Sequence, residues 1–193
     1  IRDEALIATV TDVSGKGVGA GMIASGVHAG VRLMVTGSRD LSEVAGRINS
    51  YLAGATADNR FATFAMVSID PDGRLRAVNA GHLPVLIRRR DGTIEEINSS
   101  GLPLGILAVA NYSESVASIE PGELVALFTD GLTEAEDSNE EEFGVERVAE
   151  VTAKLEEPTA EKLCGAILEA VGAFTGGGAL HDDATLLVVE RLE

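Results

Sequence analysis

An acidic residue stands where an apolar, strand-like run meets a turn of small residues, and this junction recurs along the chain. The acids at these junctions are Asp12, Asp130 and the adjacent pair Asp182 and Asp183. The runs beside them are short and rich in Val, Leu and Ile, which is typical of buried strands. If these strands are neighbours in a sheet, their acids converge at one edge of it. Such a fold would bring three distant parts of the chain together.

The acids at these junctions suggest a hard metal ion. Carboxylate oxygens without accompanying Cys ligands favour magnesium or manganese over zinc. Two such ions a few ångströms apart can activate a water molecule and hold a phosphate for in-line displacement. The pattern therefore predicts hydrolysis of a phosphoester, with Asp12, Asp130 and either Asp182 or Asp183 as the carboxylates that hold the ions.

The glycine-rich turn after Asp12 has other interpretations. A strand, an acid, a glycine turn and a helix often follow one another with no site present. Residues 15–19 (Gly-Lys-Gly-Val-Gly) also invite comparison with a nucleotide-binding loop. However, the pattern G-x-x-x-x-G-K-[ST] is absent, and G-x-G-x-x-G is not completed because position 20 is Ala. A nucleotide loop is therefore not predicted here.

Periodicity predicts alternating groups of helices and strands. Residues 40–43 resemble a capping box, in which Asp40 accepts hydrogen bonds from the first helical turn. The helices are expected at residues 18–35, 41–52, 145–155 and 160–174, the last of them capped by Thr159. Strands are expected at residues 5–10, 61–69, 74–79, 84–90, 93–98, 123–128 and 185–189, with two hairpin turns at 70–73 and 91–92.

Three polar features receive structural interpretations. His82 lies in a Gly-Pro loop and is expected to brace that loop by hydrogen bonding, not to act as a catalyst. The acid-rich residues 134–142 lack the ligand order and turn Gly of a calcium loop, so a solvated, mobile loop is expected. Arginines alternate with apolar residues in the two hairpins, and a solvated strand face is favoured over a docking patch. These arginines are Arg74, Arg76, Arg88 and Arg90.

Length, charge and cysteine content narrow the classes of protein to which this chain can belong. The 193 residues suit one domain, and the net charge of -16 disfavours binding to nucleic acid or an anionic membrane while being compatible with divalent cations. Cys164 is the only cysteine, so no internal disulfide can form and a reducing, cytoplasmic location is expected. No signal peptide or membrane span is evident. The chain begins with Ile and enters a strand almost directly, which suggests a piece of a longer polypeptide.

Six short motifs, in order, resemble those of the metal-dependent type 2C protein phosphatases. The match is to the bacterial, SpoIIE-like branch, which includes the sporulation stage II phosphatase and the stress-response phosphatases that act on anti-sigma factor antagonists. The motifs are residues 12–17 (Asp-Val-Ser-Gly-Lys-Gly), 79–84 (Asn-Ala-Gly-His-Leu-Pro), 101–105 (Gly-Leu-Pro-Leu-Gly), 128–135 (Phe-Thr-Asp-Gly-Leu-Thr-Glu-Ala), 143–144 (Phe-Gly) and 182–185 (Asp-Asp-Ala-Thr).

The resemblance implies an α+β fold, a four-layer α-β-β-α sandwich of two antiparallel sheets flanked by helices. It also implies two Mn2+ or Mg2+ ions at one end. Asp12 would bridge the ions and the carbonyl of Val13 would ligate the second, while Asp130 and Asp182 would complete the first. Asp183 is the neighbouring metal position, where the family commonly has Asn or Asp.

One departure from the family pattern concerns the start of the chain. The family begins with a strand carrying a Gly-Gly-Asp-aromatic-Tyr-Asp motif, whose acid helps to hold the second metal, and this sequence starts after it. Residues 1–193 are therefore interpreted as a SpoIIE-like phosphatase domain that lacks the first metal-motif strand. A sensor domain further upstream and a homodimer are further expectations.

Three hypotheses about function stay open at this point. The first is a protein serine/threonine phosphatase, in which metal-bound water attacks phosphoserine or phosphothreonine on an anti-sigma factor antagonist. The second, which the missing first motif favours, is a catalytically silent regulatory module that binds a partner through the same surface. The third is a metal-dependent phosphatase for small molecules, since nothing in the sequence fixes substrate size.

Overall fold

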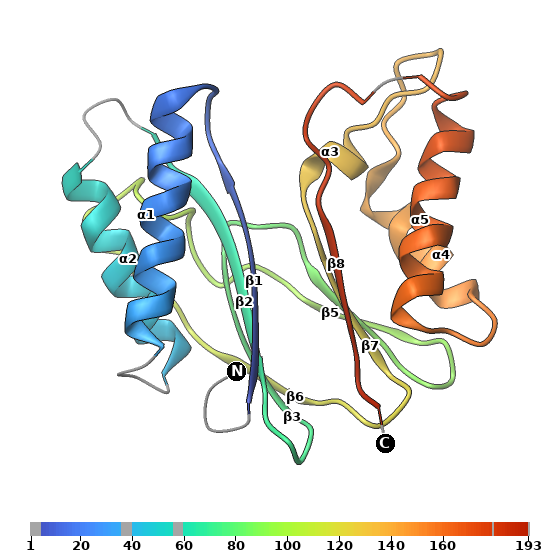
Figure 1. Cartoon of the computed structure of the whole chain (residues 1–193), viewed down its shortest axis with the longest axis horizontal. Helices are drawn as coiled ribbons and strands as arrows, with labels where there is room; N and C mark the ends of the chain where they lie inside the picture. Colours follow the sequence, from blue (N-terminus) through green and yellow to red (C-terminus); the bar gives the residue numbers. More distant parts are fainter. Residues whose placement is uncertain (1–4, 36–39, 56–59, 179, 193) are drawn as a thin grey trace. The chain divides into compact units, whose positions relative to one another are not determined.

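A computed structural model describes residues 5–35, 40–55, 60–178 and 180–192. The chain divides into two units, the first formed by Ile1–His82 and Asn98–Ser118 and the second by Leu83–Ile97 and Ile119–Glu193. Each unit has its own four-stranded antiparallel sheet with helices against it (Figure 1). The predicted α+β class, with two antiparallel sheets flanked by helices, is thus confirmed.

The first sheet has the strand order β1-β2-β3-β6. Its strands are β1 (Leu6–Val13), β2 (Ala62–Ile69), β3 (Arg74–Ala80) and β6 (Ser115–Ser118), and its helices are α1 (Val18–Met34) and α2 (Leu41–Ala55). The hairpin predicted around residues 70–73 joins β2 to β3, and the Gly73 amide donates to the Asp70 carbonyl at 2.9 Å. Strand β6 had no prediction, because its four residues (Ser-Val-Ala-Ser) carry too weak a pattern.

Helices α1 and α2 pack on one face of the first sheet (Figure 1). The buried residues of α2 recur at helical spacing, as the periodicity predicted, although Tyr51 on the same helix is exposed. The predicted cap is also present, since Asp40 Oδ1 accepts from the amides of Ser42 at 2.9 Å and Glu43 at 3.1 Å. The core of this unit includes Val27, Val31, Leu41, Val44, Ile48, Leu52, Phe64, Met66, Val78 and Leu104.

The second sheet has the strand order β5-β4-β7-β8. Its strands are β4 (Val85–Arg88), β5 (Ile94–Ile97), β7 (Leu124–Phe128) and β8 (Leu186–Glu190), and its helices are α3 (Asp130–Thr133), α4 (Gly144–Lys154) and α5 (Ala160–Phe174). Thr159 caps α5 as predicted, accepting from the Lys162 amide at 3.2 Å. None of the described helices has the length and apolarity needed to cross a lipid bilayer.

Helices α4 and α5 cover one face of the second sheet (Figure 1). Leu163, Ile167 and Val171 of α5 are buried against it, as their spacing predicted. Phe143 and Phe174 meet edge to face with ring centroids 5.3 Å apart. The second unit therefore has an aliphatic and aromatic core of its own.

The prediction for the arginines is wrong in one important respect. Arg74 and Arg76 belong to β3, whereas Arg88 belongs to β4 in the other sheet. Arg88 is not solvated but 5% exposed, and its guanidinium donates to the carbonyls of Thr152 and Leu155, both at 2.8 Å. These carbonyls lie at the end of α4, where a helix leaves its last carbonyls without helical partners. The sequence could not show that the end of α4 lies beside β4.

We expect Arg88→Met to lower the free energy of unfolding by about 2–3 kcal/mol, because it leaves buried carbonyls without donors. Arg90→Met is the matched control: the side chain of the exposed Arg90 donates to the Pro121 carbonyl at 2.7 Å, and its loss should cost less than about 1 kcal/mol. Urea denaturation of both variants measures the difference. Equal losses in the two variants would contradict the capping role of Arg88.

Candidate active site

Asp130 stands at the junction between β7 and α3. Every residue of β7 is buried, so this strand is a rigid support for the helix and loop attached to its end. Thr129 is the N-cap position of α3, and Asp130 is its first residue. The backbone carbonyl of Asp130 accepts from the Glu134 amide at 2.7 Å, which closes the single turn of the helix. The side chain of Asp130 is half-buried at this strand end, as the sequence predicted.

The pairing of β7 with β8 brings Asp182 and Asp183 to the same sheet edge. Phe128 is opposite Leu186 in the register, and three hydrogen bonds involving Thr129 continue the pairing beyond the strands. The Thr129 amide donates to the Thr185 carbonyl at 3.0 Å, the Thr185 amide to Thr129 Oγ1 at 2.8 Å, and Thr129 Oγ1 to the Asp183 carbonyl at 3.3 Å. Thr129 thus fixes the acid pair beside the segment that carries Asp130.

Gly131 allows this close approach of two backbone segments. A Cβ atom at this position would lie 2.4 Å from the carbonyl oxygen of Asp183 and 3.2 Å from Cα of Ala184. Real side chains do not tolerate such distances, so only glycine fits without moving the loop. The sequence marked Gly131 as a turn residue, but its contact with Asp183 depends on the β7–β8 pairing.

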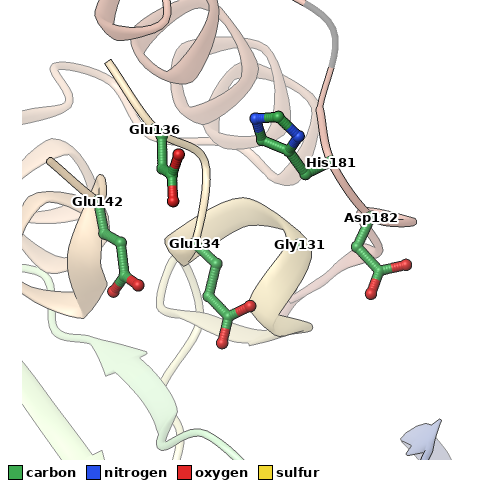
Figure 2. A pocket seen from close by; sticks show the side chains of 6 residues that line it. All are labelled: Gly131, Glu134, Glu136, Glu142, His181 and Asp182. Atoms are coloured by element: carbon green, nitrogen blue, oxygen red, sulfur yellow. The ribbon is translucent and has the colours of Figure 1, made fainter. Parts of the chain in front are cut away.

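A shallow pocket of about 190 Å³ opens beside α3. Figure 2 shows the residues that line it, which are Gly131, Glu134, Glu136, Glu142, His181 and Asp182. Asp182 and His181 are exposed, and Asp182 Oδ1 accepts from the Asp183 amide at 2.9 Å. The pocket is therefore strongly acidic and reaches the predicted metal position at Asp182.

The acid-rich segment beside this pocket is more ordered than expected. Its carboxylates are largely exposed, as predicted, but its backbone closes into a hairpin-like turn with a bridge between Glu136 and Glu142. Asp137 Oδ1 accepts from the amides of Glu141 and Asn139, and these hydrogen bonds lower the pKa of Asp137. The sequence analysis did not foresee that an Asp side chain organises a turn here, and the mobility of the segment stays a prediction.

Asp12 and Val13 end β1 in the first unit. Asp12 is opposite Thr63 and Val13 is opposite Ala62, and both are half-buried. The chain then turns through Gly15 and Gly17, whose φ angles of +90° and +81° favour glycine. After this turn it enters α1. The predicted order of strand, acid, glycine turn and helix is therefore present.

His82 is buried and braces its loop by hydrogen bonding, as the sequence predicted. Its Nδ1 lies 2.7 Å from Thr63 Oγ1, and its amide donates to Asn79 Oδ1 at 2.9 Å. Thr63 is the residue opposite Asp12 in the β1–β2 register. His82 therefore supports the strand end that carries Asp12 through Thr63.

The predicted metal ligands have the donor atoms that a hard divalent cation requires. All of them are oxygen donors, which fits Mg2+ or Mn2+, and the tight approach of Gly131 to Asp183 fits a preformed ligand loop. Across the ranges that the structure describes, no three Asp, Glu, His or Cys side chains are grouped so as to hold a metal by themselves. The residues of each unit thus suit a hard cation, while the complete ligand set stays a prediction.

Comparison with known sequences finds a family model that matches almost the whole chain. A family model described as stage II sporulation protein E (SpoIIE) matches residues 2–192. Protein IcfG of Synechocystis sp. is 32% identical over 146 residues, which cover 74% of this chain and 23% of IcfG. The phosphoserine phosphatase RsbU of Bacillus subtilis is 25% identical over 201 residues, which cover 97% of this chain and 56% of RsbU. The chain thus spans a quarter to about half of these relatives.

Comparison with solved structures supports the fold. The SiaA-PP2C domain of Pseudomonas aeruginosa superposes with a TM-score of 0.86 at 20% identity, covering 100% of this chain and 78% of that one. RsbX in complex with magnesium superposes with a TM-score of 0.72 at 18% identity, covering 97% of this chain and 82% of that one. The two sheets and their helices are therefore those of PP2C domains.

Proposed function

This chain belongs to the stage II sporulation protein E (SpoIIE) family, and we propose that its residues 1–193 form the catalytic domain of a metal-dependent protein serine/threonine phosphatase. The observation that carries the proposal is the β7–β8 pairing, which holds Asp182 and Asp183 next to the segment of Asp130. Asp130 and the pair Asp182 and Asp183 thus lie on adjoining loops at one sheet edge. A cation bound between these loops would offset the repulsion among their negative charges.

We assign divalent cations to the oxygen ligands of these loops. Two ions, Mn2+ or Mg2+, would be held by the carboxylates of Asp12, Asp130, Asp182 and Asp183 and by the backbone carbonyl of Val13. RsbX, whose fold this chain shares, is a magnesium complex. Bound at these residues, such ions would supply an activated water and neutralise the oxygens of the phosphoryl group. The ligand set combines hard oxygens only, which favours these ions over zinc.

Because the chain is strongly negative, the proposed hydrolysis requires a bound cation. The net charge of -16 and the acidic pocket at Asp182 repel a phosphate monoester. The carboxylates therefore have to be occupied before the substrate can approach. Thr129 and Gly131 keep the Asp182–Asp183 loop in position while the cation and then the substrate bind, since both contact the backbone of Asp183.

The proposed substrate is phosphoserine or phosphothreonine on a regulatory protein of the anti-sigma factor antagonist type. This assignment rests on family membership and on the relative RsbU, which is a phosphoserine phosphatase. A cytoplasmic location, a sensor domain elsewhere in the full-length protein and a homodimer complete the proposal. The lone Cys164 is in keeping with a reducing compartment.

Hydrolysis of p-nitrophenyl phosphate tests this function. We expect turnover in MnCl2, none in EDTA, and more turnover when the chain is extended at its N-terminus by the strand that carries the family's first acid. A catalytically silent binding module would instead hydrolyse nothing in either length and would bind its partner equally well with the chelator present. That pair of results would refute the enzymatic assignment.

A further inference from the structure

A loop in the first unit presents apolar side chains to solvent. Residues 101–112 (Gly-Leu-Pro-Leu-Gly-Ile-Leu-Ala-Val-Ala-Asn-Tyr) contain no charged side chain in a protein that has 46 charged residues, 15 basic and 31 acidic. Ile106, Leu107 and Val109 are 45%, 51% and 84% exposed, and the neighbouring Phe61 is 36% exposed. We call these four residues the apolar loop surface. Grouped exposed apolar residues mark interaction sites more often than scattered ones do.

The fold holds this loop firmly, so its exposure is not that of a loosely attached segment. Leu104 is fully buried, and its backbone exchanges two hydrogen bonds with Ala62, of 2.9 and 2.8 Å. Asn49 of α2 is 1% exposed, and both the oxygen and the nitrogen of its side-chain amide form hydrogen bonds with the loop. The Gly105 amide donates to Asn49 Oδ1 at 2.9 Å, and Asn49 Nδ2 donates to the Leu107 carbonyl at 2.9 Å. A buried polar side chain thus fixes a loop that exposes apolar ones.

The apolar loop surface adjoins the segment that carries Asp12. Phe61 and Ser14 exchange two hydrogen bonds, both 2.9 Å long, directly after the β1 strand end. Gly105 packs on the same segment, since a Cβ at this position would lie 3.1 Å from the Arg60 carbonyl and 3.7 Å from Cα of Phe61. Continuous contacts therefore connect the loop to the residues beside the proposed metal ligand.

The charges next to this surface favour an anionic partner. Residues 13–35 contain no Asp or Glu, although the chain has 31 of them. Lys16 is exposed in the glycine turn. Arg60 is half-buried, and its covered Nη1 lies against Gly19, where a Cβ would be 2.3 Å from it. A phosphorylated protein that approaches residues 13–35 meets Lys16 and a stretch without acidic side chains, which favours an anionic partner.

We propose that the apolar loop surface, with Lys16 and Arg60 beside it, is the docking site for the folded phosphoprotein substrate. The proposal rests on the phosphatase function above and adds where the substrate binds. The partner presents an apolar surface next to its phosphoserine, and Leu107 and Val109 contact that surface. Small phosphoesters do not reach this loop, so the site distinguishes protein substrates from small molecules.

The test compares Leu107→Asp with Leu168→Asp. Both replace an exposed leucine by the same residue, at 51% and 53% exposure, but Leu168 lies on α5 in the other unit. The probe is a phosphoserine-carrying anti-sigma factor antagonist, whose Kd is measured by calorimetry in the presence of Mn2+. We expect Leu107→Asp to weaken binding about 10- to 100-fold, as loss of a central apolar contact does, and Leu168→Asp to leave it within about twofold.

Parallel measurements separate the two proposals. Hydrolysis of p-nitrophenyl phosphate should be the same in the wild type and in both variants, and its complete absence from the wild type in both chain lengths would refute the phosphatase and not the docking site. An unchanged Kd for Leu107→Asp overturns the docking site. So does sedimentation that shows a dimer of the wild type becoming a monomer in Leu107→Asp, because a second copy would then cover the loop.

Discussion

The variant Asp130→Asn is expected to lose at least about 100-fold of the manganese-dependent phosphatase activity, because loss of residues that merely support a metal ligand already costs up to this much. The amide of Asn keeps the size of the side chain but lacks the negative charge that holds a divalent cation. Turnover of p-nitrophenyl phosphate, measured over a range of MnCl2 concentrations, checks this expectation. The apparent affinity for Mn2+ should fall together with the rate.

The fold should survive the change at Asp130. The contacts that structure α3 involve the backbone of this residue, whose carbonyl accepts from the Glu134 amide at 2.7 Å and from Thr133 Oγ1 at 3.3 Å. The melting temperature of Asp130→Asn should therefore lie within a few degrees of the wild type. Asp72→Asn, an exposed turn residue between β2 and β3, is the control and should leave activity unchanged. Full activity of Asp130→Asn would contradict its assignment as a ligand.

The variant Gly131→Ala is expected to lose activity and stability together. The new Cβ would lie 2.4 Å from the Asp183 carbonyl oxygen and 2.8 Å from its carbon, so one of the two segments has to move. Such overpacking typically costs about 1–3 kcal/mol. A shift of about 1 Å in the loop of Asp182 and Asp183 would also lower kcat by about 100-fold, because cation ligands act only at defined positions. Urea denaturation and steady-state kinetics measure the two losses.

Gly165→Ala serves as the control for this second prediction. Gly165 lies within α5 and is exposed, and a Cβ added to it would have no neighbouring atom within 4 Å, so alanine fits freely. Alanine stabilises a helix interior by about 0.5–1 kcal/mol relative to glycine, and activity should not change. If Gly131→Ala behaved like Gly165→Ala, the close contact between α3 and the Asp183 backbone would be unimportant.

Local sequence patterns predicted most of the elements correctly. The spacing of Leu41, Val44, Ile48 and Leu52 predicted α2, and Asp40 predicted where it starts. The acids at strand ends were recognised because an apolar run, an acid and a glycine are adjacent in the chain. These features depend on neighbours in sequence, so no tertiary information was needed to find them.

Features that depend on tertiary pairing could not be predicted in the same way. The solvated interpretation of Arg88 failed because the end of α4, which Arg88 binds, is 64 or more positions away in the sequence. The role of Thr129 between Asp130 and Asp183 depends on the β7–β8 register. Asn49 resembles any polar helix residue in the sequence, and only the structure shows that it is buried and binds residues 105 and 107.

The most direct test of the phosphatase assignment is the release of inorganic phosphate from a phosphoserine-carrying anti-sigma factor antagonist, measured in MnCl2 and in EDTA. We expect release that requires Mn2+, that continues through many turnovers, and that is lost in Asp130→Asn. If the chain bound the phosphoprotein but released no phosphate in MnCl2, the phosphatase assignment would be contradicted. The chain would then be a binding module of the same fold.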